Sequence, residues 1–308
     1  MASSGGSKAA GNDYFHDDGY AKVQLFEPVE PATVDSQAGL TVRIAESLLK
    51  KNYAVMDGLL GAQEAMNLRA EVARYYKDGL MVDGEIGQGV TASTGSVKRA
   101  MRTDKVVWFE GSEAFVGPSM KRHITRMDII TQKVAILLEA IAPEQSWTGA
   151  RRSKIMATVY AGSGAKYVPH YDNPNRNGRR LTAILYLNPE WKPQHGGTMR
   201  MKTQRTVVDV APLLDRMLFF WSDTRCPHEV LPATGPDRYA ITIWFMDEKE
   251  RFAAEADEAR EDKAKAQMDE QPPARTATSV VEAAAAAAEA QTPERDIAAA
   301  IDADSGPE

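Results

Sequence analysis

The sequence predicts an α+β fold in which a double-stranded β-helix, or jelly roll, packs on helices from the first half of the chain. Two observations lead to this prediction. Helical periods dominate before about residue 150, whereas short β runs separated by turns follow from residue 151. Many short strands at close spacing are typical of a sandwich or jelly roll, and the early helices would bury one face of a sheet.

Three helices are expected before residue 150. Helical periods run over about 39–51 and 62–77, with a short strand at 53–56 between them. The third helix begins at Pro118, a residue type favoured in the first turn of a helix, and reaches about residue 141. Its apolar stripe is expected to face the core and consists of Met120, Ile124, Met127, Ile130, Val134, Leu138 and Ile141.

The expected strands lie in the second half of the chain. They cover residues 155–160, 181–187, 198–201, 206–210, 217–221, 228–231 and 239–246. Turns rich in glycine, proline and asparagine separate them, such as Gly162-Ser163-Gly164 and Gly196-Gly197. We therefore assign residues 37–150 to a helical support region and residues 151–247 to the jelly-roll core.

The two ends of the chain differ in composition from this core. Residues 1–36 are small, polar or acidic and show no sustained period, so we expect a disordered leader. Residues 248–270 form a charged helical stretch that Pro272-Pro273 terminates. Residues 271–308 are rich in alanine and acidic residues without a face to bury, and a disordered tail is expected there.

Composition excludes several classes of function. The 308 residues carry a net charge of −6, which gives no electrostatic reason to expect nucleic acid or an anionic membrane as a partner. One cysteine, Cys226, permits neither an intrachain disulfide nor a four-cysteine zinc site, and this suits a reducing compartment, the cytoplasm or nucleus. The sequence has no stretch that resembles a signal peptide and no run of eighteen apolar residues, so no membrane span is expected.

A His-x-Asp pair, followed at a distance by a second histidine, is the main chemical signal. His170 and Asp172 are two residues apart, so on a strand their side chains point to the same face. His228 follows 56 residues after Asp172 in another β run. Two histidines and one carboxylate cover one face of an octahedron and leave three positions open, which is typical of non-haem Fe(II) oxygenases. By itself the pair is also common in surface turns.

An anchor for a carboxylate follows ten residues after His228. Arg238 lies in the last β run, where its guanidinium can hold a carboxylate by two parallel hydrogen bonds. Tyr186 ends an apolar run and could add its hydroxyl to the clamp. 2-Oxoglutarate can chelate iron through its 1-carboxylate and 2-keto oxygens and place its far carboxylate on such a clamp, with O2 in the last position. A hydrolytic zinc site could use the same three ligands but would not need the clamp.

Several longer motifs carry a resemblance to a known family. They are Tyr160-Ala161-Gly162, Tyr167-Val168-Pro169-His170-Tyr171-Asp172-Asn173-Pro174, Tyr186-Leu187-Asn188, Leu218-Phe219-Phe220-Trp221-Ser222-Asp223, Pro227-His228-Glu229-Val230 and Arg238-Tyr239-Ala240-Ile241-Thr242. In these blocks, and upstream over 102–111, the chain resembles the cytoplasmic prolyl 4-hydroxylases related to the hypoxia-inducible-factor hydroxylases. The likeness is weaker over about 53–100 and does not include the two ends. The segment between His228 and Arg238 is one residue longer than is usual in the animal enzymes, and a turn can absorb it.

The resemblance implies a role for each matching residue. His170, Asp172 and His228 would be the iron ligands, and Arg238 with Tyr186 the cosubstrate clamp. The remaining pocket-lining positions would be Tyr160, Thr182 and Trp244. Arg102 and Asp104 match an ion pair that positions a loop over the peptide substrate, and here this lid would cover about 84–104. The other interpretation of that glycine-rich loop is an ordinary flexible hairpin.

The implied activity is 4-hydroxylation of a proline in a protein by a monomeric dioxygenase that uses Fe(II), 2-oxoglutarate, O2 and ascorbate, with oxygen sensing as one role. Two substrates compete: an oxygen-regulated transcription factor, as for hypoxia factors, and the adaptor subunit of SCF ubiquitin ligases. The lack of a zinc-finger module and the compact N-terminus favour the second. Alternatives are an oxygenase acting on a small molecule or a ribosomal protein, and an inactive binding or scaffold protein.

Three other residues receive no role at this stage. His123 lies next to Lys121 and Arg122 and is expected on the solvated face of its helix. His195 precedes Gly196-Gly197 and is expected in a turn. A lone cysteine such as Cys226 is most often simply packed.

Overall fold

Two β-sheets lie face to face in the computed structural model, which describes residues 19–29, 37–85, 102–147, 151–204 and 206–269. The first sheet has the strand order β1-β9-β8-β11-β6 and the second the order β2-β10-β7-β12-β5-β4-β3. The strands are β1 Ala21–Leu25, β2 Tyr53–Asp57, β3 Val82–Asp83, β4 Lys105–Phe109, β5 Ile155–Tyr160, β6 Ala165–His170, β7 Arg179–Tyr186, β8 Met199–Thr203, β9 Thr206–Val210, β10 Arg216–Trp221, β11 His228–Ala233 and β12 Arg238–Met246. This arrangement confirms the expected jelly roll.

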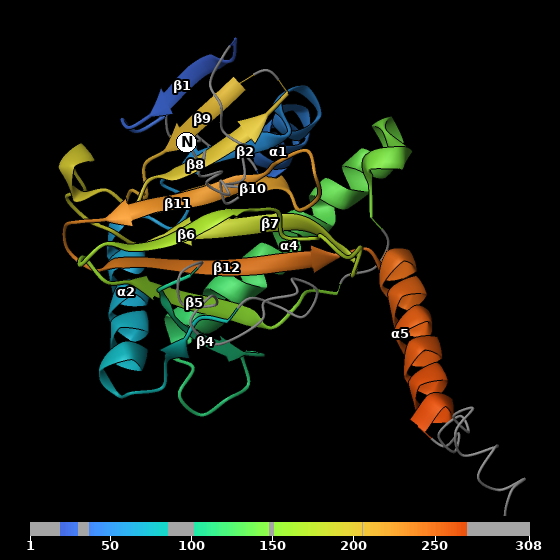
Figure 1. Ribbon diagram of the computed structural model, residues 1–308. Helices are drawn as coiled ribbons and strands as arrows, with labels where there is room; N and C mark the ends of the chain where they lie inside the picture. Colours follow the sequence, from blue (N-terminus) through green and yellow to red (C-terminus); the bar gives the residue numbers. More distant parts are fainter. Residues whose placement is uncertain (1–18, 30–36, 86–101, 148–150, 205, 270–308) are drawn as a thin grey trace, which may run out of the picture. The chain divides into compact units, whose positions relative to one another are not determined.

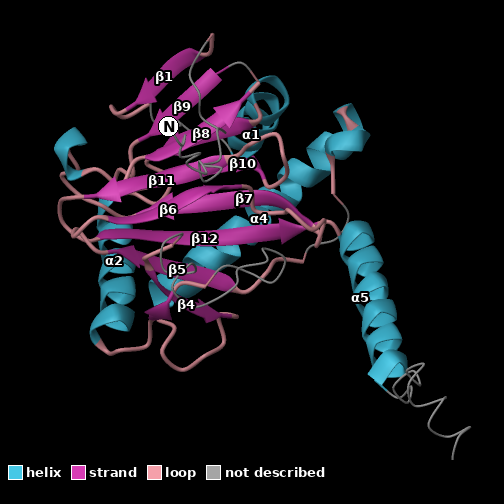
Figure 2. Cartoon of the chain, in the orientation of Figure 1, coloured by secondary structure: helices cyan, strands magenta, loops and turns pink. Residues whose placement is uncertain are grey.

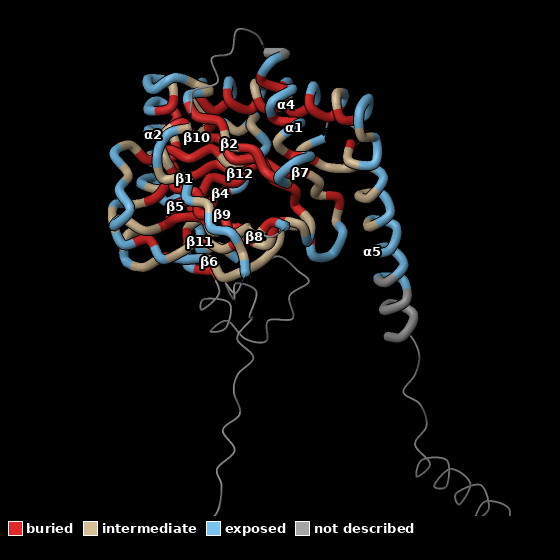
Figure 3. Tube along the Cα trace, turned by 90° about the horizontal axis from the view of Figure 1, so that it is seen from above, coloured by how far each residue is buried: buried red, intermediate tan, exposed pale blue. Residues whose placement is uncertain are grey.

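Three helices cover the outer face of the second sheet. They are α1 Gln37–Lys51, α2 Ala62–Lys77 and α4 Pro118–Ile141, and Figure 3 shows them together on one side of the sheet. One hydrophobic core joins their buried faces to the sheet residues beneath, among them Leu48, Val72, Met127, Leu185 and Phe219. The helices therefore form the support layer that the first half of the sequence predicts, and Figure 2 shows them beside the strands.

Helix α4 begins where a carboxylate from α2 meets its free backbone amides. Glu71 accepts hydrogen bonds from the amides of Ser119 and Met120 at 2.9 and 3.1 Å. A negative charge at this end also interacts favourably with the helix dipole. A side chain at Gly117 would collide with the Glu71 carboxylate, since a Cβ atom there would lie 2.4 Å from it. One predicted core residue was wrong: Ile141, at the last position of the helix, is 54% exposed.

The expected strands are confirmed with small shifts at their ends, but four strands, β1, β3, β4 and β6, were not foreseen. β6 was missed because Lys166, Pro169 and the half-exposed positions around them interrupt the apolar pattern. β4 and the two-residue strand β3 lie on either side of the predicted lid, 84–104, and no strand was predicted at either place. β4 pairs with β5 and β3 with β4, and local sequence does not encode these contacts between distant segments.

The leader was predicted to be disordered throughout, and for residues 21–25 this is wrong. They form β1, which pairs in parallel with β9. The buried guanidinium of Arg216 makes a two-pronged ion pair with Asp57 at 2.8 Å and donates to the carbonyls of Leu25 and Glu27. These long-range bonds fix a segment whose own composition favours disorder. Residues 1–18 and 30–36 lie outside the described part of the chain.

The C-terminal region contains α5, Glu248–Asp269, which confirms the predicted charged helix. By compactness the chain divides into residues 1–256 and 257–308, so α5 begins in the first unit and continues into the second. The predicted tail, 271–308, lies outside the described residues. Among the described residues, no helix is both long and apolar enough to span a bilayer.

His123 does not lie on the solvated face of α4, as expected, but in the core, where it is 2% exposed. Helical period places it one turn before Met127 and beside the buried Ile124, and its neighbours in sequence gave no sign of this. Burial, with a smaller contribution from the charge of Arg126, lowers the pKa of His123 from 6.5 to about 3. Its Nδ1 atom has no hydrogen-bond partner among the described residues.

Replacing His123 by leucine should make the stability of the protein less sensitive to acid. Between pH 6.5 and about 3 the unfolded chain binds a proton at His123 and the folded chain does not. The free energy of unfolding therefore decreases as the pH is lowered, by up to about 1.4 kcal/mol per pH unit. Urea unfolding at pH 7, 6 and 5 would measure this slope in both proteins. A difference between them that stays constant with pH would contradict the prediction.

Candidate metal centre and active site

Three possible metal ligands come together between the two sheets. His170 ends β6 and His228 begins β11, and the two residues are direct partners in the antiparallel register. The Nε2 atoms of both histidines lie 3.7 Å from Oδ1 of Asp172, and the ligand atoms of all three residues lie within 4.8 Å of one another. The shared face expected of His170 and Asp172 required both to lie on one strand, but β6 ends at His170 and Asp172 lies just beyond it.

Both imidazoles are held with the same nitrogen toward the cavity. The Nδ1 atoms of His170 and His228 lie 2.8 and 2.9 Å from the carbonyls of Val168 and Cys226, each two residues earlier in the chain. A carbonyl can only accept, so Nδ1 carries the proton and Nε2 keeps a free lone pair. Aromatic rings pack against both imidazoles. The Tyr167 ring stacks on that of His170 with 3.7 Å between centroids, and the Phe220 ring meets that of His228 edge-on with 4.8 Å between centroids.

A chain of hydroxyl groups orients the carboxylate. Thr182 on β7 donates to Oδ2 of Asp172 at 2.7 Å, and its own oxygen lies 2.8 Å from that of Ser222. Because the carboxylate accepts the Thr182 proton, Ser222 must donate to Thr182. Oδ1 is then left facing the two imidazoles. Thr182 was predicted to line the pocket, but it is fully buried behind Asp172 and supports a ligand instead.

The protonation states fit metal binding. Burial, and then the nearby His228, lowers the pKa of His170 to about 3, so the imidazole is neutral at neutral pH. Burial alone would raise the pKa of Asp172, but the two histidines and the Thr182 hydroxyl outweigh it and hold that pKa below its usual value. Two imidazoles and one carboxylate on one side of a cavity form the donor set that suits Fe(II) with open positions for other ligands.

The opposite end of the cavity contains the predicted carboxylate anchor. Arg238 is 5% exposed, and its guanidinium lies between the rings of Tyr160 and Tyr186, 4.8 and 5.0 Å from their centroids. Tyr160 lines the cavity as predicted. Tyr186 is fully buried and is not among the lining residues, and its hydroxyl lies 3.1 Å from Sδ of Met199. The part that Tyr186 would play in a clamp therefore stays a prediction.

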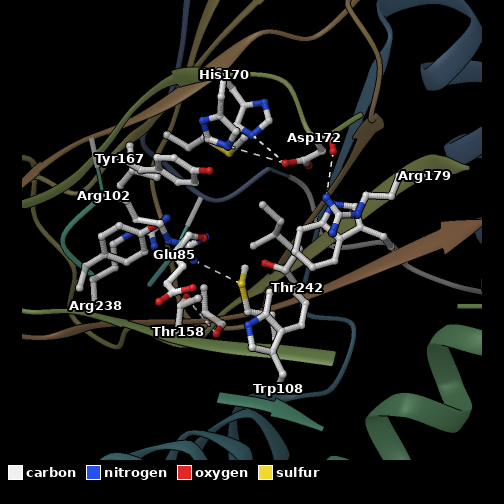
Figure 4. Close-up of a pocket in the computed structure, with 18 residues that line it drawn as sticks. Glu85, Arg102, Trp108, Thr158, Tyr167, His170, Asp172, Arg179, Arg238 and Thr242 are labelled. Atoms are coloured by element: carbon white, nitrogen blue, oxygen red, sulfur yellow. Dashed lines mark hydrogen bonds and ion pairs between the residues drawn. The ribbon is translucent and has the colours of Figure 1, made fainter. Parts of the chain in front are cut away.

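The cavity wall also includes residues that the sequence did not single out. Trp244 lines the cavity as predicted, with Arg179 4.6 Å from its ring on one side and Trp108 stacked at 5.5 Å on the other. Trp108 is 41% exposed, and Arg179 donates to the carbonyl of Asp172 at 3.0 Å. Figure 4 shows them on the side of the cavity away from Arg238. The alternation of side chains along a strand could have identified Trp108 as a cavity residue, but no local sequence pattern distinguishes Arg179.

The predicted ion pair at the base of the lid is present. Arg102 and Asp104 form two hydrogen bonds of 2.7 and 2.8 Å, both residues are buried, and Arg102 also lies over the ring of Tyr167. Gly84 packs directly on this pair, since a Cβ atom there would lie 2.4 Å from Nε of Arg102. Residues 86–101, most of the predicted lid, lie outside the described part of the chain.

His195 and Cys226 behave as the sequence suggested. His195 ends a short 3-10 turn, Pro193–His195, and its Nδ1 accepts a hydrogen bond from the backbone amide of Lys192. Cys226 is fully buried.

Replacing Thr182 by valine should weaken metal binding by about 10- to 100-fold, because the carboxylate of Asp172 loses the donor that turns Oδ1 toward the imidazoles. Equilibrium dialysis with Mn²⁺, which does not oxidise during the measurement, would give the dissociation constant. Thr131→Val is a matched control, because Thr131 is a buried threonine on α4 that bonds only its own helix. Equal metal affinity in Thr182→Val and the native protein would refute the role of the hydroxyl.

Comparisons with known proteins agree with this geometry. Residues 155–246 match the model of the 2OG-Fe(II) oxygenase superfamily. Prolyl hydroxylase EGLN3 of Mus musculus is 35% identical over 222 residues, which are 68% of this chain and 85% of the relative. The hypoxia-inducible factor prolyl hydroxylase of Caenorhabditis elegans is 32% identical over 233 residues, but the chain spans only 31% of that longer protein.

Solved structures of prolyl hydroxylases are also similar to this chain. A prolyl hydroxylase from Trichoplax adhaerens, in complex with a hypoxia inducible factor oxygen degradation domain peptide fragment, aligns with a TM-score of 0.63 and 32% identity and covers 70% of this chain and 93% of the other. A prolyl-4-hydroxylase from Pseudomonas putida aligns with a TM-score of 0.55 and 25% identity over 67% of this chain and 99% of the other. The chain thus belongs to the prolyl hydroxylase family of Fe(II)- and 2-oxoglutarate-dependent dioxygenases, enzymes that require Fe(II), 2-oxoglutarate and O2.

Proposed function

We propose that this protein hydroxylates a proline at its 4-position within a protein substrate, coupled to the conversion of 2-oxoglutarate and O2 to succinate and CO2. The observation that carries the proposal is the arrangement of one cavity. Three metal ligands lie at one place in it, a buried arginine forms another wall, and an exposed tryptophan lies between the cavity and solvent. A small acid cosubstrate and a bulky peptide can therefore reach the same metal from different sides.

Different cavity residues would bind the metal, bind the cosubstrate and exclude water. His170, Asp172 and His228 would hold Fe(II), which supplies the activation of O2 that no side chain can perform. Arg238 would hold the far carboxylate of 2-oxoglutarate, and this fixes the keto acid end at the metal. Burial raises the pKa of Tyr160, and that of Tyr186 to about 12, so both phenols remain neutral donors beside that carboxylate. The apolar side chains of Met156 and Trp244 exclude water from the reacting groups.

The substrate side of the cavity suits an extended peptide. Trp108 and Trp244 form a stacked pair that can pack on a proline ring, and Arg179 offers donors next to it. Arg102 and Asp104 directly follow residues 86–101, and Arg102 lines the cavity, so a lid there would end at the cavity wall. Related enzymes act on hypoxia-inducible factor, as their names state, which supports a protein substrate for this chain.

We further propose that the enzyme acts as a monomer in the cytoplasm or nucleus and that ascorbate supports its turnover. The substrate is either an oxygen-regulated transcription factor or the adaptor subunit of an SCF ubiquitin ligase. A small molecule or a ribosomal protein is the alternative substrate. The intact ligand set and anchor speak against an inactive scaffold.

The deciding experiment incubates the purified protein with Fe(II), ascorbate and 2-oxoglutarate, with and without proline peptides from both candidate substrates. Succinate and peptide mass are measured together. A gain of one oxygen on a proline, equal in amount to the succinate formed, is expected with one of the two peptides. Succinate without peptide oxidation would refute the proposed substrates, and no succinate from iron-loaded protein would refute the activity.

Replacing Arg238 by lysine should raise the KM for 2-oxoglutarate by about tenfold or more, because a point charge replaces a two-pronged donor. The free energy of unfolding should change much less than binding. Steady-state kinetics with varied 2-oxoglutarate would measure KM, and urea unfolding the stability. Arg122→Lys is the matched control, since Arg122 makes a two-pronged ion pair with Glu64 far from the cavity. An unchanged KM in Arg238→Lys would place the anchor elsewhere.

A further inference from the structure

The orientation of Arg238 depends on one backbone carbonyl behind it. Nε of Arg238 donates to the oxygen of Gly197 at 2.7 Å, the only hydrogen bond of this side chain to the backbone in the described part of the chain. With Nε engaged, a carboxylate can meet two donors of the guanidinium only at its far end, at Nη1 and Nη2. The Gly197 carbonyl therefore decides which edge of Arg238 is available to a ligand.

Gly197 is also the place where a side chain would displace Arg238. Its φ angle is +67°, and a Cβ atom there would lie 2.7 Å from Cδ of Arg238 and 3.4 Å from Cβ of Ala233. The first distance is shorter than any real contact, so the arginine stem would have to move. A glycine is needed here both for its backbone conformation and for the space that it leaves.

A network of backbone bonds holds Gly197 in position. Its amide donates to the carbonyl of Pro232 at 3.0 Å, and the amides of Thr234 and Gly235 donate to the carbonyl of His195. On the other side, Nε1 of Trp191 donates to the carbonyl of Gly196 at 2.9 Å. The segment 191–197 is thus tied to the turn that leads into β12, immediately before Arg238.

We propose that Gly197 is a positioning residue for 2-oxoglutarate, which acts by presenting the far end of the Arg238 guanidinium to the cosubstrate. The proposal rests on the assignment of Arg238 as the carboxylate anchor and goes beyond it. Gly197 itself touches no substrate. Its substitution should affect ligands that have a far carboxylate and spare those that bind only at the metal.

The test compares Gly197→Ala with Gly164→Ala in the full chain. Gly164 has a φ of +100° and nothing within 4 Å of a built Cβ, so alanine there introduces the same kind of backbone strain without a collision. Calorimetry on Mn²⁺-loaded protein gives the Kd for 2-oxoglutarate and for pyruvate, which has the keto acid end but no far carboxylate. Iron-dependent turnover then separates KM from kcat.

For Gly197→Ala we expect the Kd and KM for 2-oxoglutarate to rise by about tenfold, with pyruvate affinity, Mn²⁺ affinity and kcat nearly unchanged. Gly164→Ala should bind 2-oxoglutarate like the native protein. Native affinity in Gly197→Ala would overturn the proposal, and so would equal losses in the two variants or an equal loss for pyruvate. Failure of the native protein to bind 2-oxoglutarate would overturn the anchor as well, whereas binding without proline hydroxylation would sink only the proposed function.

A second variant decides the question if Gly197→Ala does not fold. Trp191→Phe keeps the ring contact with Phe26, 5.7 Å between centroids, and removes only the donor to Gly196. Loosening the same segment should raise the Kd for 2-oxoglutarate by about threefold and leave that for pyruvate unchanged. Equal affinity of this variant and the native protein for 2-oxoglutarate would then count against the role of the segment.

Discussion

The pairing register between β6 and β11 is the constraint on which the rest of the site depends. It sets His170 directly opposite His228, with both rings on the inner face of the sheet. Because side chains alternate along a strand, a shift of one residue in either strand would turn one histidine outward. The register is irregular after His228, because Val230 lies opposite Tyr167 and Ala233 opposite Ala165, so the pairing shifts twice along the two strands.

The two sheets contribute different halves of the chemistry. Both histidines come from the first sheet, whereas Arg238, Trp244 and the Thr182 hydroxyl come from the second. Asp172, in the turn between β6 and β7, joins the two sheets, because Thr182 on β7 holds one of its oxygens and the other faces the histidines. The distance between metal and carboxylate anchor is therefore set by how the two sheets pack, and the helices behind the second sheet keep that sheet rigid.

Sequence alone predicted the jelly roll and its three supporting helices from their regular periods, and it predicted the residues of the candidate site from long motifs. What it missed depends on contacts between distant segments. The charged neighbours of His123 predicted a surface position, but its place on the inner face of the helix puts the side chain in the core. Thr182 was expected at the pocket wall, but Asp172 covers it. Strand β1 could not be foreseen, because a buried arginine nearly two hundred residues later holds it in place. Arg179 carries no local signal at all.

The attachment of β1 has a consequence for the behaviour of the protein in solution. β1 is the last strand on its side of the first sheet, and it covers β9, whose Val207, Val208 and Val210 are all buried. Without residues 21–27, β9 would become an open strand of high β-propensity, and the buried guanidinium of Arg216 would lose two of its acceptors, the carbonyls of Leu25 and Glu27. An unprotected edge of this kind recruits other chains, so proteolysis near the N-terminus would lead to aggregation before any loss of the metal centre.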